Sequence, residues 1–110
     1  MTIENEDVID TAGVDEETGE IVLTISDHLP WQDSGRHCRL LEKKISRYLA
    51  FVRGGQILQQ FPQAAGTPVR INLICEHDLT EFALRFLAAA RQQLGAAGIT
   101  FSYGKLPAGF

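Results

Sequence analysis

The sequence predicts an α/β domain of α+β character, a two-layer sandwich in which a four-stranded mixed sheet carries two helices on one face. Three observations lead to this prediction. Four short segments alternate apolar and polar residues, which is the pattern of half-buried strands. Two longer segments place apolar residues three and four positions apart, which is the pattern of amphipathic helices. The segments follow one another in the order ββαβαβ, so each helix connects two strands of one sheet.

The first two strands are expected to form a β-hairpin. The first strand lies within residues 7–15, and the acidic turn EETGE separates it from the second strand, residues 21–26. In the second strand Ile21, Leu23 and Ile25 alternate with more polar side chains, so one face of the strand should be buried.

Residues 34–53 form the first predicted helix. Apolar side chains recur there at helical spacing, and the Gly54-Gly55 pair ends the segment. The predicted buried stripe comprises Cys38, Leu41, Ile45, Tyr48, Leu49 and Val52. Residues 56–68 follow as a connector, in which prolines and a glycine oppose continuous regular structure.

The second half of the chain repeats the strand-helix-strand pattern. Residues 69–75 alternate as a third strand, and Asp78 with Glu81 has the form of a capping box at the start of the second helix. Gly95 or Gly98 should end that helix, and a final strand follows at 99–103. The second apolar stripe comprises Leu79, Phe82, Ala83, Phe86, Leu87, Ala90 and Leu94.

The chirality of strand-helix-strand connections then sets the topology. Right-handed crossovers make strands two, three and four parallel, and the hairpin adds strand one antiparallel beside strand two. The expected order is 1-2-3-4, with both helices on the same face and the other face open. We expect residues 1–110 to form a single domain, in which residues 1–6 and 105–110 are loosely attached.

Bulk composition narrows the function classes. The formal net charge is −4, which does not favour binding to nucleic acid or anionic membranes. The N-terminal residues lack the pattern of a secretion signal, and no apolar run reaches membrane-spanning length, so a cytoplasmic protein is expected. Cys38 and Cys75 are far apart and lack metal-ligand spacing, so we interpret both as buried apolar residues. No cofactor is expected.

Polar side chains follow the second and third strands at the point where each strand ends. Asp27 and His28 end one strand, and His77 and Asp78 follow the other; Trp31 lies just beyond the first pair. Because the ends of neighbouring parallel strands share one edge, these side chains could converge on a divalent metal or an anion. The alternative is structural: Asp78 and either residue 33 or 34 cap helices, the histidines face solvent, and the tryptophan covers the core.

Charge is distributed unevenly along the chain. The hairpin turn carries Asp15, Glu16, Glu17 and Glu20, which suits a docking surface for a basic protein or a solubilising edge. The first helix carries a basic stripe made of Arg36, Arg39, Lys43 and Arg47, with Lys44 and Arg53 nearby. Such a stripe could follow RNA phosphates, although a solvated helix face is the favoured interpretation.

Two stretches of the chain resemble a family of small bacterial proteins that share a domain of unknown function. These stretches are DVIDTAGVDEETGEIVLTISDHLPW and RYLAFVRGGQI. The S-D-H-L-x-W string is the most specific part of this resemblance, which spans most of the chain. The resemblance implies a bacterial, cytosolic, single-domain protein. It implies no activity, ligand or catalytic residue.

The favoured hypothesis is a non-enzymatic protein-interaction domain that self-associates, as a homodimer, through the open face of the sheet. A second hypothesis is an immunity-type inhibitor that covers a basic toxin with the acidic hairpin. A third is a metal- or anion-dependent enzyme at the edge formed by Asp27, His28, His77 and Asp78. RNA binding by the first helix is the fourth.

Overall fold

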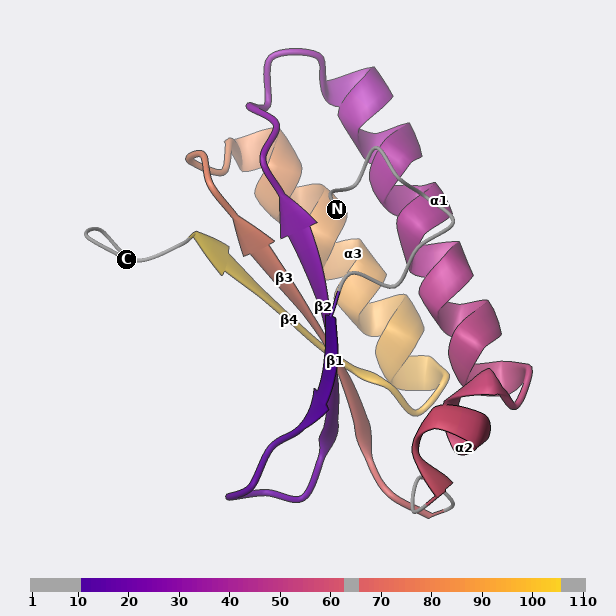
Figure 1. Cartoon of the computed structure of the whole chain (residues 1–110). Coiled ribbons are helices and arrows are strands. Elements are labelled where there is room, and N and C mark those ends of the chain that lie inside the picture. Colours follow the sequence, from indigo (N-terminus) through magenta and orange to yellow (C-terminus); the bar gives the residue numbers. More distant parts are fainter. Residues whose placement is uncertain (1–10, 63–65, 106–110) are drawn as a thin grey trace.

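The computed structural model describes residues 11–62 and 66–105 (Figure 1). Its strands are β1 (Thr11–Val14), β2 (Ile21–Asp27), β3 (Val69–Cys75) and β4 (Thr100–Lys105). Its helices are α1 (Ser34–Arg53), α2 (Gln56–Gln60) and α3 (Glu81–Ala96). The sheet has the order β1-β2-β3-β4, with β1 antiparallel to β2 and the other neighbours parallel. The predicted sheet and its order are confirmed.

The helices α1 and α3 lie over the same face of the sheet, as predicted (Figure 1). Strands β2 and β3 both alternate between fully buried and half-buried positions, so one side of each strand forms the core and the other side forms the open face. In β2, Ile21, Leu23 and Ile25 have no exposed surface, and in β3 the same holds for Ile71 and Leu73.

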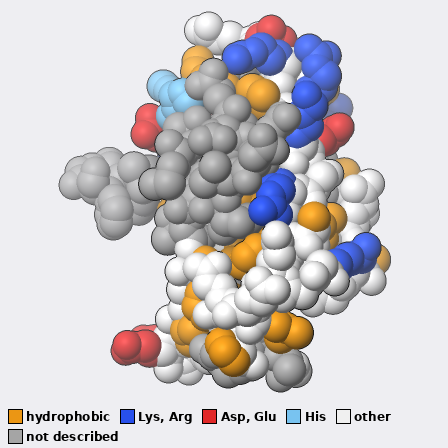
Figure 2. Space-filling model, turned by 45° about the vertical axis from the view of Figure 1, so that its right-hand side comes forward, with side chains coloured by type: hydrophobic (Ala, Val, Ile, Leu, Met, Phe, Trp, Pro, Cys, Tyr) orange, Lys and Arg blue, Asp and Glu red, His pale blue; other side chains and the backbone are white. Residues whose placement is uncertain are grey.

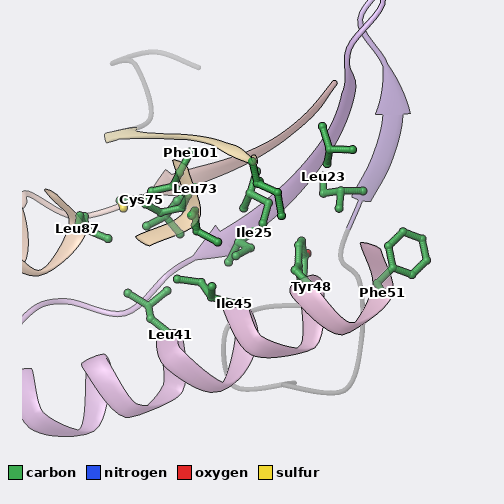
Figure 3. Packing of buried hydrophobic residues seen from close by; sticks show 14 of the residues in the cluster. Leu23, Ile25, Leu41, Ile45, Tyr48, Phe51, Leu73, Cys75, Leu87 and Phe101 are labelled. Atoms are coloured by element: carbon green, nitrogen blue, oxygen red, sulfur yellow. The ribbon is translucent and has the colours of Figure 1, made fainter. Parts of the chain in front are cut away.

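Helix α1 packs its buried side directly onto these strands. Figure 3 shows Leu41, Ile45 and Tyr48 pointing from α1 toward the sheet. The hydroxyl of Tyr48 donates a hydrogen bond to the backbone carbonyl of Thr24 at 2.5 Å, which joins the helix to β2. Fully burying an apolar side chain such as Leu41 contributes about 1.5–3 kcal/mol, so the packing of α1 on the sheet stabilises the fold.

The buried side of α1 is rotated relative to the predicted stripe. Cys38, Leu49 and Val52 are only half-buried, whereas His37 and Lys44 are buried together with Phe51 and three of the predicted residues. The prediction was wrong here because it counted only apolar side chains. Polar residues take up part of the face that packs on the sheet.

The connector after α1 contains a short helix that the sequence analysis did not predict. Gly55 adopts a left-handed conformation, φ 84°, which breaks the chain direction and lets α2 begin at the next residue. Ile57 is 3% exposed and attaches α2 to the core. The strand order is therefore unchanged, but the element order is ββααβαβ.

The ends of the other elements differ slightly from the prediction. Thr80, not Asp78, caps α3, because its side chain accepts a hydrogen bond from the backbone N–H of Ala83. Strand β4 extends to Lys105, a residue that was expected to be loosely attached. Residues 1–6 and 106–110, and the part of the predicted first strand before residue 11, lie outside the described residues. Within the described part of the chain, no helix has the length and apolar character needed to cross a membrane.

Candidate functional site

Asp27, at the end of β2, is a buried residue that is 1% exposed. Its Oδ2 atom lies 2.5 Å from Nε2 of His37 in α1, and its Oδ1 atom accepts the backbone N–H of Leu29 at 3.1 Å. Because a carboxylate only accepts hydrogen bonds, we assign the proton of this pair to Nε2 of the histidine. Both carboxylate oxygens are therefore engaged, and the pair joins the end of β2 to the first turns of α1.

Trp31 covers this pair from the loop between β2 and α1. Its ring stacks on the imidazole of His37, with ring centroids 3.7 Å apart and the planes inclined by 14°. The other nitrogen of the imidazole, Nδ1, and the indole nitrogen of Trp31 are buried and have no hydrogen-bond partner among the described residues. The predicted role of Trp31 as a cover over the core fits this geometry.

Cys75 ends β3 beside this buried pair, in register with Asp27. Burial, together with the nearby Asp27 carboxylate, raises the pKa of the Cys75 thiol to about 12. Burial also raises the pKa of the half-buried Cys38, and the charge of Glu42 adds to that effect. Both cysteines are therefore thiols at neutral pH, which is the protonation state of an unreactive side chain.

His77 and Asp78 lie in the exposed loop that follows β3. Asp78 accepts a hydrogen bond from Nζ of Lys105, at the end of β4, at 2.7 Å. That bond and the ammonium charge lower the pKa of the Asp78 carboxyl, and His77 makes a smaller contribution in the same direction. The carboxylate at the end of β3 is thus paired across the sheet toward β4, away from β2.

The structure therefore brings the predicted edge residues to one end of the sheet but divides them between two environments. Asp27 and Trp31 belong to a buried cluster with His37, whereas His77 and Asp78 face solvent. His28 follows Asp27 and is half-buried. Across the described ranges, 11–62 and 66–105, no group of three or more His, Cys, Asp or Glu side chains is arranged to hold a metal ion.

His37 is the residue of this cluster that the sequence analysis did not identify. The helical spacing contains a signal for its burial, because His37 lies four positions before the buried Leu41. Lys44 lies three positions after Leu41, so it also belongs to the buried side of α1. A small pocket of about 160 Å³ lies beside the His37 ring, bordered by Leu29 and Arg36 among others. The Asp27–His37 pair has the composition of an acid–base pair, but His37 is 2% exposed.

The acidic turn between β1 and β2 is partly occupied by its own hydrogen bonds. The Asp15 side chain accepts the backbone N–H groups of Glu17 and Thr18, which holds the turn closed. Glu20 forms an ion pair with Arg70 on β3, at 3.3 Å between Oε1 and Nε. Glu16 and the carboxylate of Glu17 are exposed. Two of the four predicted partner-binding residues, Asp15 and Glu20, therefore make contacts within the chain, and the role of the four in binding stays a prediction.

The basic stripe of α1 is exposed at Arg36, Arg39 and Lys43, whereas Lys44 is fully buried with its Nζ 5.8 Å from the centre of the Tyr48 ring. Figure 2 shows Lys and Arg side chains gathered at the upper right of the face that it draws, with acidic side chains close by. Basic and acidic side chains are therefore mixed on this surface, and RNA binding by α1 stays an untested hypothesis.

A groove runs between the outer sides of α1 and α3. Its volume is about 520 Å³. The side of the groove formed by α1 comprises Glu42, Ile45, Ser46, Leu49 and Arg53. The side formed by α3 and its C-cap comprises Phe86, Ala89, Ala90, Gln93, Leu94 and Ala97. Most of these side chains are apolar. Phe82, one helical turn before Phe86 on the same side of α3, is 53% exposed although it was predicted to be buried.

The open face of the sheet has a different character. Arg70 connects Glu20 to Ser102, whose hydroxyl in turn contacts Asn72, each link being 3.3 Å long. This chain of polar side chains crosses β3 and β4. Val22 is one of the half-buried apolar residues beside it. Glu20, Arg70, Ser102 and Asn72 thus form one connected set of hydrogen bonds on this face.

These features define a small two-layer α/β sandwich domain with a buried Asp–His pair at one end of its sheet and an apolar groove on its helical layer. The chain belongs to a family of unknown function, DUF6572, whose family model matches residues 1–106. No curated protein and no solved structure matches the chain. Membership confirms the resemblance to a family of unknown function, while the S-D-H-L-x-W string as its marker and the bacterial origin stay predictions.

Proposed function

We propose that the protein is a non-enzymatic protein-interaction domain and that the groove between α1 and α3 is its docking surface. The observation that carries this proposal is the groove itself, about 520 Å³ of space between two helices, with mostly apolar walls. Apolar surface gathered in a concave site releases water when a partner covers it, and this release is the main driving force of protein association.

The exposed ring of Phe82 extends the same apolar surface along α3. Aromatic side chains are enriched at the centres of protein interfaces, because they bury a large area for a small loss of conformational freedom. Phe82 and Phe86 lie one turn apart on the groove side of the helix. Together they supply the type of anchor that a docking surface needs.

The groove supports the proposal better than the open sheet face, where we first expected self-association. A partner covering that face would have to remove water from Arg70, Glu20 and Ser102, which are already paired with one another. Arg70 and Glu20 carry charges, and taking charged groups out of water costs free energy even when they are paired. The groove carries no comparable polar network.

The alternative functions have less support. An immunity-type inhibitor would rely on the acidic turn, yet Asp15 closes the turn and Glu20 is paired with Arg70. A metal- or anion-dependent enzyme would rely on Asp27 and Asp78, yet these carboxylates are engaged by different partners. These interactions favour the groove over both surfaces.

Site-specific photo-cross-linking tests the proposal. A benzophenone amino acid placed at Ser46, on the groove, should yield one discrete protein adduct in the source cell. The matched control is the same probe at Ala88, which is also exposed on a helix but lies on the side of α3 away from the groove. This control should yield no adduct.

A third probe position distinguishes docking in the groove from the hypothesis of an immunity-type inhibitor. The same probe at Glu17, in the acidic turn, should give no adduct if the groove is the docking surface. An adduct from Glu17 without one from Ser46 would contradict the proposal and favour the inhibitor. Absence of an adduct at all three positions would also contradict it.

A further inference from the structure

We infer that the partner in the groove is a second copy of this chain, bound antiparallel about a two-fold axis that crosses α1 near Ser46. The inference rests on the proposed docking function and names the partner of that same groove. Two independent properties of the groove support it: the charges at its ends and the sizes of its side chains.

The two charged residues of the groove lie at its opposite ends. Glu42 and Arg53 both belong to α1 and border the groove. They are eleven residues apart in the sequence, or about 16 Å along the helix at a rise of 1.5 Å per residue. Both are exposed, and within the described residues neither has an ion pair or a side-chain hydrogen bond.

A two-fold rotation turns this arrangement into charge complementarity. In a two-fold interface, if a first residue contacts a second residue of the partner, the second also contacts the partner's first. A rotation about an axis across the middle of α1 places each copy's Glu42 against the partner copy's Arg53. Opposite charges then meet at both ends of the interface, and the apolar walls lie between them.

The side-chain sizes agree with the same rotation. Both α1 and α3 start near the same end of the sheet and run in the same direction (Figure 1). Along α3 the groove begins at the large ring of Phe86 and ends at Ala97, with Ala89 and Ala90 between. An antiparallel second copy therefore sets the ring of each chain against the small side chains of the other, and large side chains pack well against small ones.

The helical layer is large enough for such an interface. A stable interface of standard size takes about 800 Å² from each partner, which is about one eighth of the 6450 Å² of surface that this chain exposes. The helices α1 and α3, of 20 and 16 residues, form one side of the molecule, on which such an interface would lie (Figure 1).

Charge reversal tests the inference by sedimentation equilibrium of the full chain. The wild type should have twice the chain mass of 12.2 kDa. The single variants Glu42→Arg and Arg53→Glu should each raise the dimer dissociation constant about tenfold or more, because both symmetry-related pairs become repulsive. The double variant Glu42→Arg/Arg53→Glu should restore the dimer.

A mixture of the two single variants is the most specific test of the predicted charge pairing. An equimolar mixture of Glu42→Arg with Arg53→Glu should form a heterodimer more tightly than either variant pairs with itself, since all four charges then find opposite partners. Circular dichroism of each variant checks that the fold is retained. The substituted residues are exposed, so the fold should not depend on them.

Three results would overturn the inference: a monomeric wild type, single variants as tightly paired as the wild type, or a mixture that forms no heterodimer. The inference and the proposed function can fail separately. If the wild type is monomeric and the probe at Ser46 captures a different protein, the inference is wrong and the docking function stands. If the wild type is monomeric and Ser46 captures nothing, both are wrong.

Discussion

The end of the sheet and the groove on the helices differ in how far their interactions are already satisfied. At the end of the sheet, Asp27 is bonded to His37 and Asp78 to Lys105. In the groove, apolar walls face solvent, and the charged residues at its ends have no partner within the described part of the chain. The carboxylates at the end of the sheet are thus paired within the fold, while the apolar surface of the groove keeps its capacity to bind.

This comparison predicts separate consequences for substitutions in the two regions. Changes in the buried cluster should alter the free energy of unfolding and leave self-association intact wherever the chain stays folded. Changes in the groove should do the reverse. Each prediction below either sharpens this contrast or would break it.

The largest expected effect is that of His37→Ala. It removes the hydrogen-bond partner of one oxygen of the buried Asp27 carboxylate, and leaving a buried acceptor without its partner costs about 1–3 kcal/mol. The free energy of unfolding should fall by this amount in urea denaturation. The control is His77→Ala, which removes a histidine from the exposed loop after β3 and should leave the free energy of unfolding within about 0.5 kcal/mol of the wild type. Equal effects of the two substitutions would break the contrast.

A smaller effect is expected at the start of α3, where the sequence analysis chose the wrong cap. Thr80→Ala removes the side chain that accepts the N–H of Ala83 and should cost about 1 kcal/mol in the same assay. Asp78→Asn should cost less, because the Asp78–Lys105 pair is exposed to solvent. A larger loss from Asp78→Asn than from Thr80→Ala would restore Asp78 as the cap.

The Asp78–Lys105 pair also predicts a pH dependence. Because the folded state lowers the pKa of Asp78, the pair stabilises the protein at neutral pH, and this contribution is lost in acid as the pH falls through the lowered pKa. The difference in unfolding free energy between wild type and Asp78→Asn should therefore shrink on acidification. A difference that grows in acid would contradict the assignment.

The smallest expected effect is a difference in chemical reactivity between the thiols of Cys75 and Cys38. Cys75 is 1% exposed and its pKa is raised to about 12, so iodoacetamide should not modify it in the folded protein at pH 8. Cys38 is half-buried and should react slowly. Both should react readily in denaturant. Mass spectrometry of the two peptides measures this directly, and rapid labelling of folded Cys75 would show that the end of β3 is open.

The sheet could be predicted from sequence because its signals are local. The alternation through residues 21–26 and 69–75 fixed the faces of both central strands, and the right-handedness of strand-helix-strand crossovers fixed their direction. The same alternation contained more than the sequence analysis used. Asp27 continues the period of Ile21, Leu23 and Ile25, so its burial follows from the strand pattern itself.

The remaining features depend on contacts that no local pattern contains. The partner of Asp27 is His37, ten residues away on another element, and only the packing of α1 on β2 brings them together. Which of Asp78 and Thr80 caps α3 depends on backbone geometry rather than on residue type. The groove exists because α1 and α3 lie apart on the sheet, a spacing that the sequences of the separate helices do not encode.

One matched pair of variants tests most directly whether the groove is the docking surface. Ala88 and Ala89 are adjacent exposed alanines of α3, but only Ala89 borders the groove. Sedimentation equilibrium of Ala89→Glu and Ala88→Glu should be run at a concentration where the wild type is dimeric. We predict a mass of 12.2 kDa for Ala89→Glu and twice that for Ala88→Glu. Equal masses for the two variants would contradict the account.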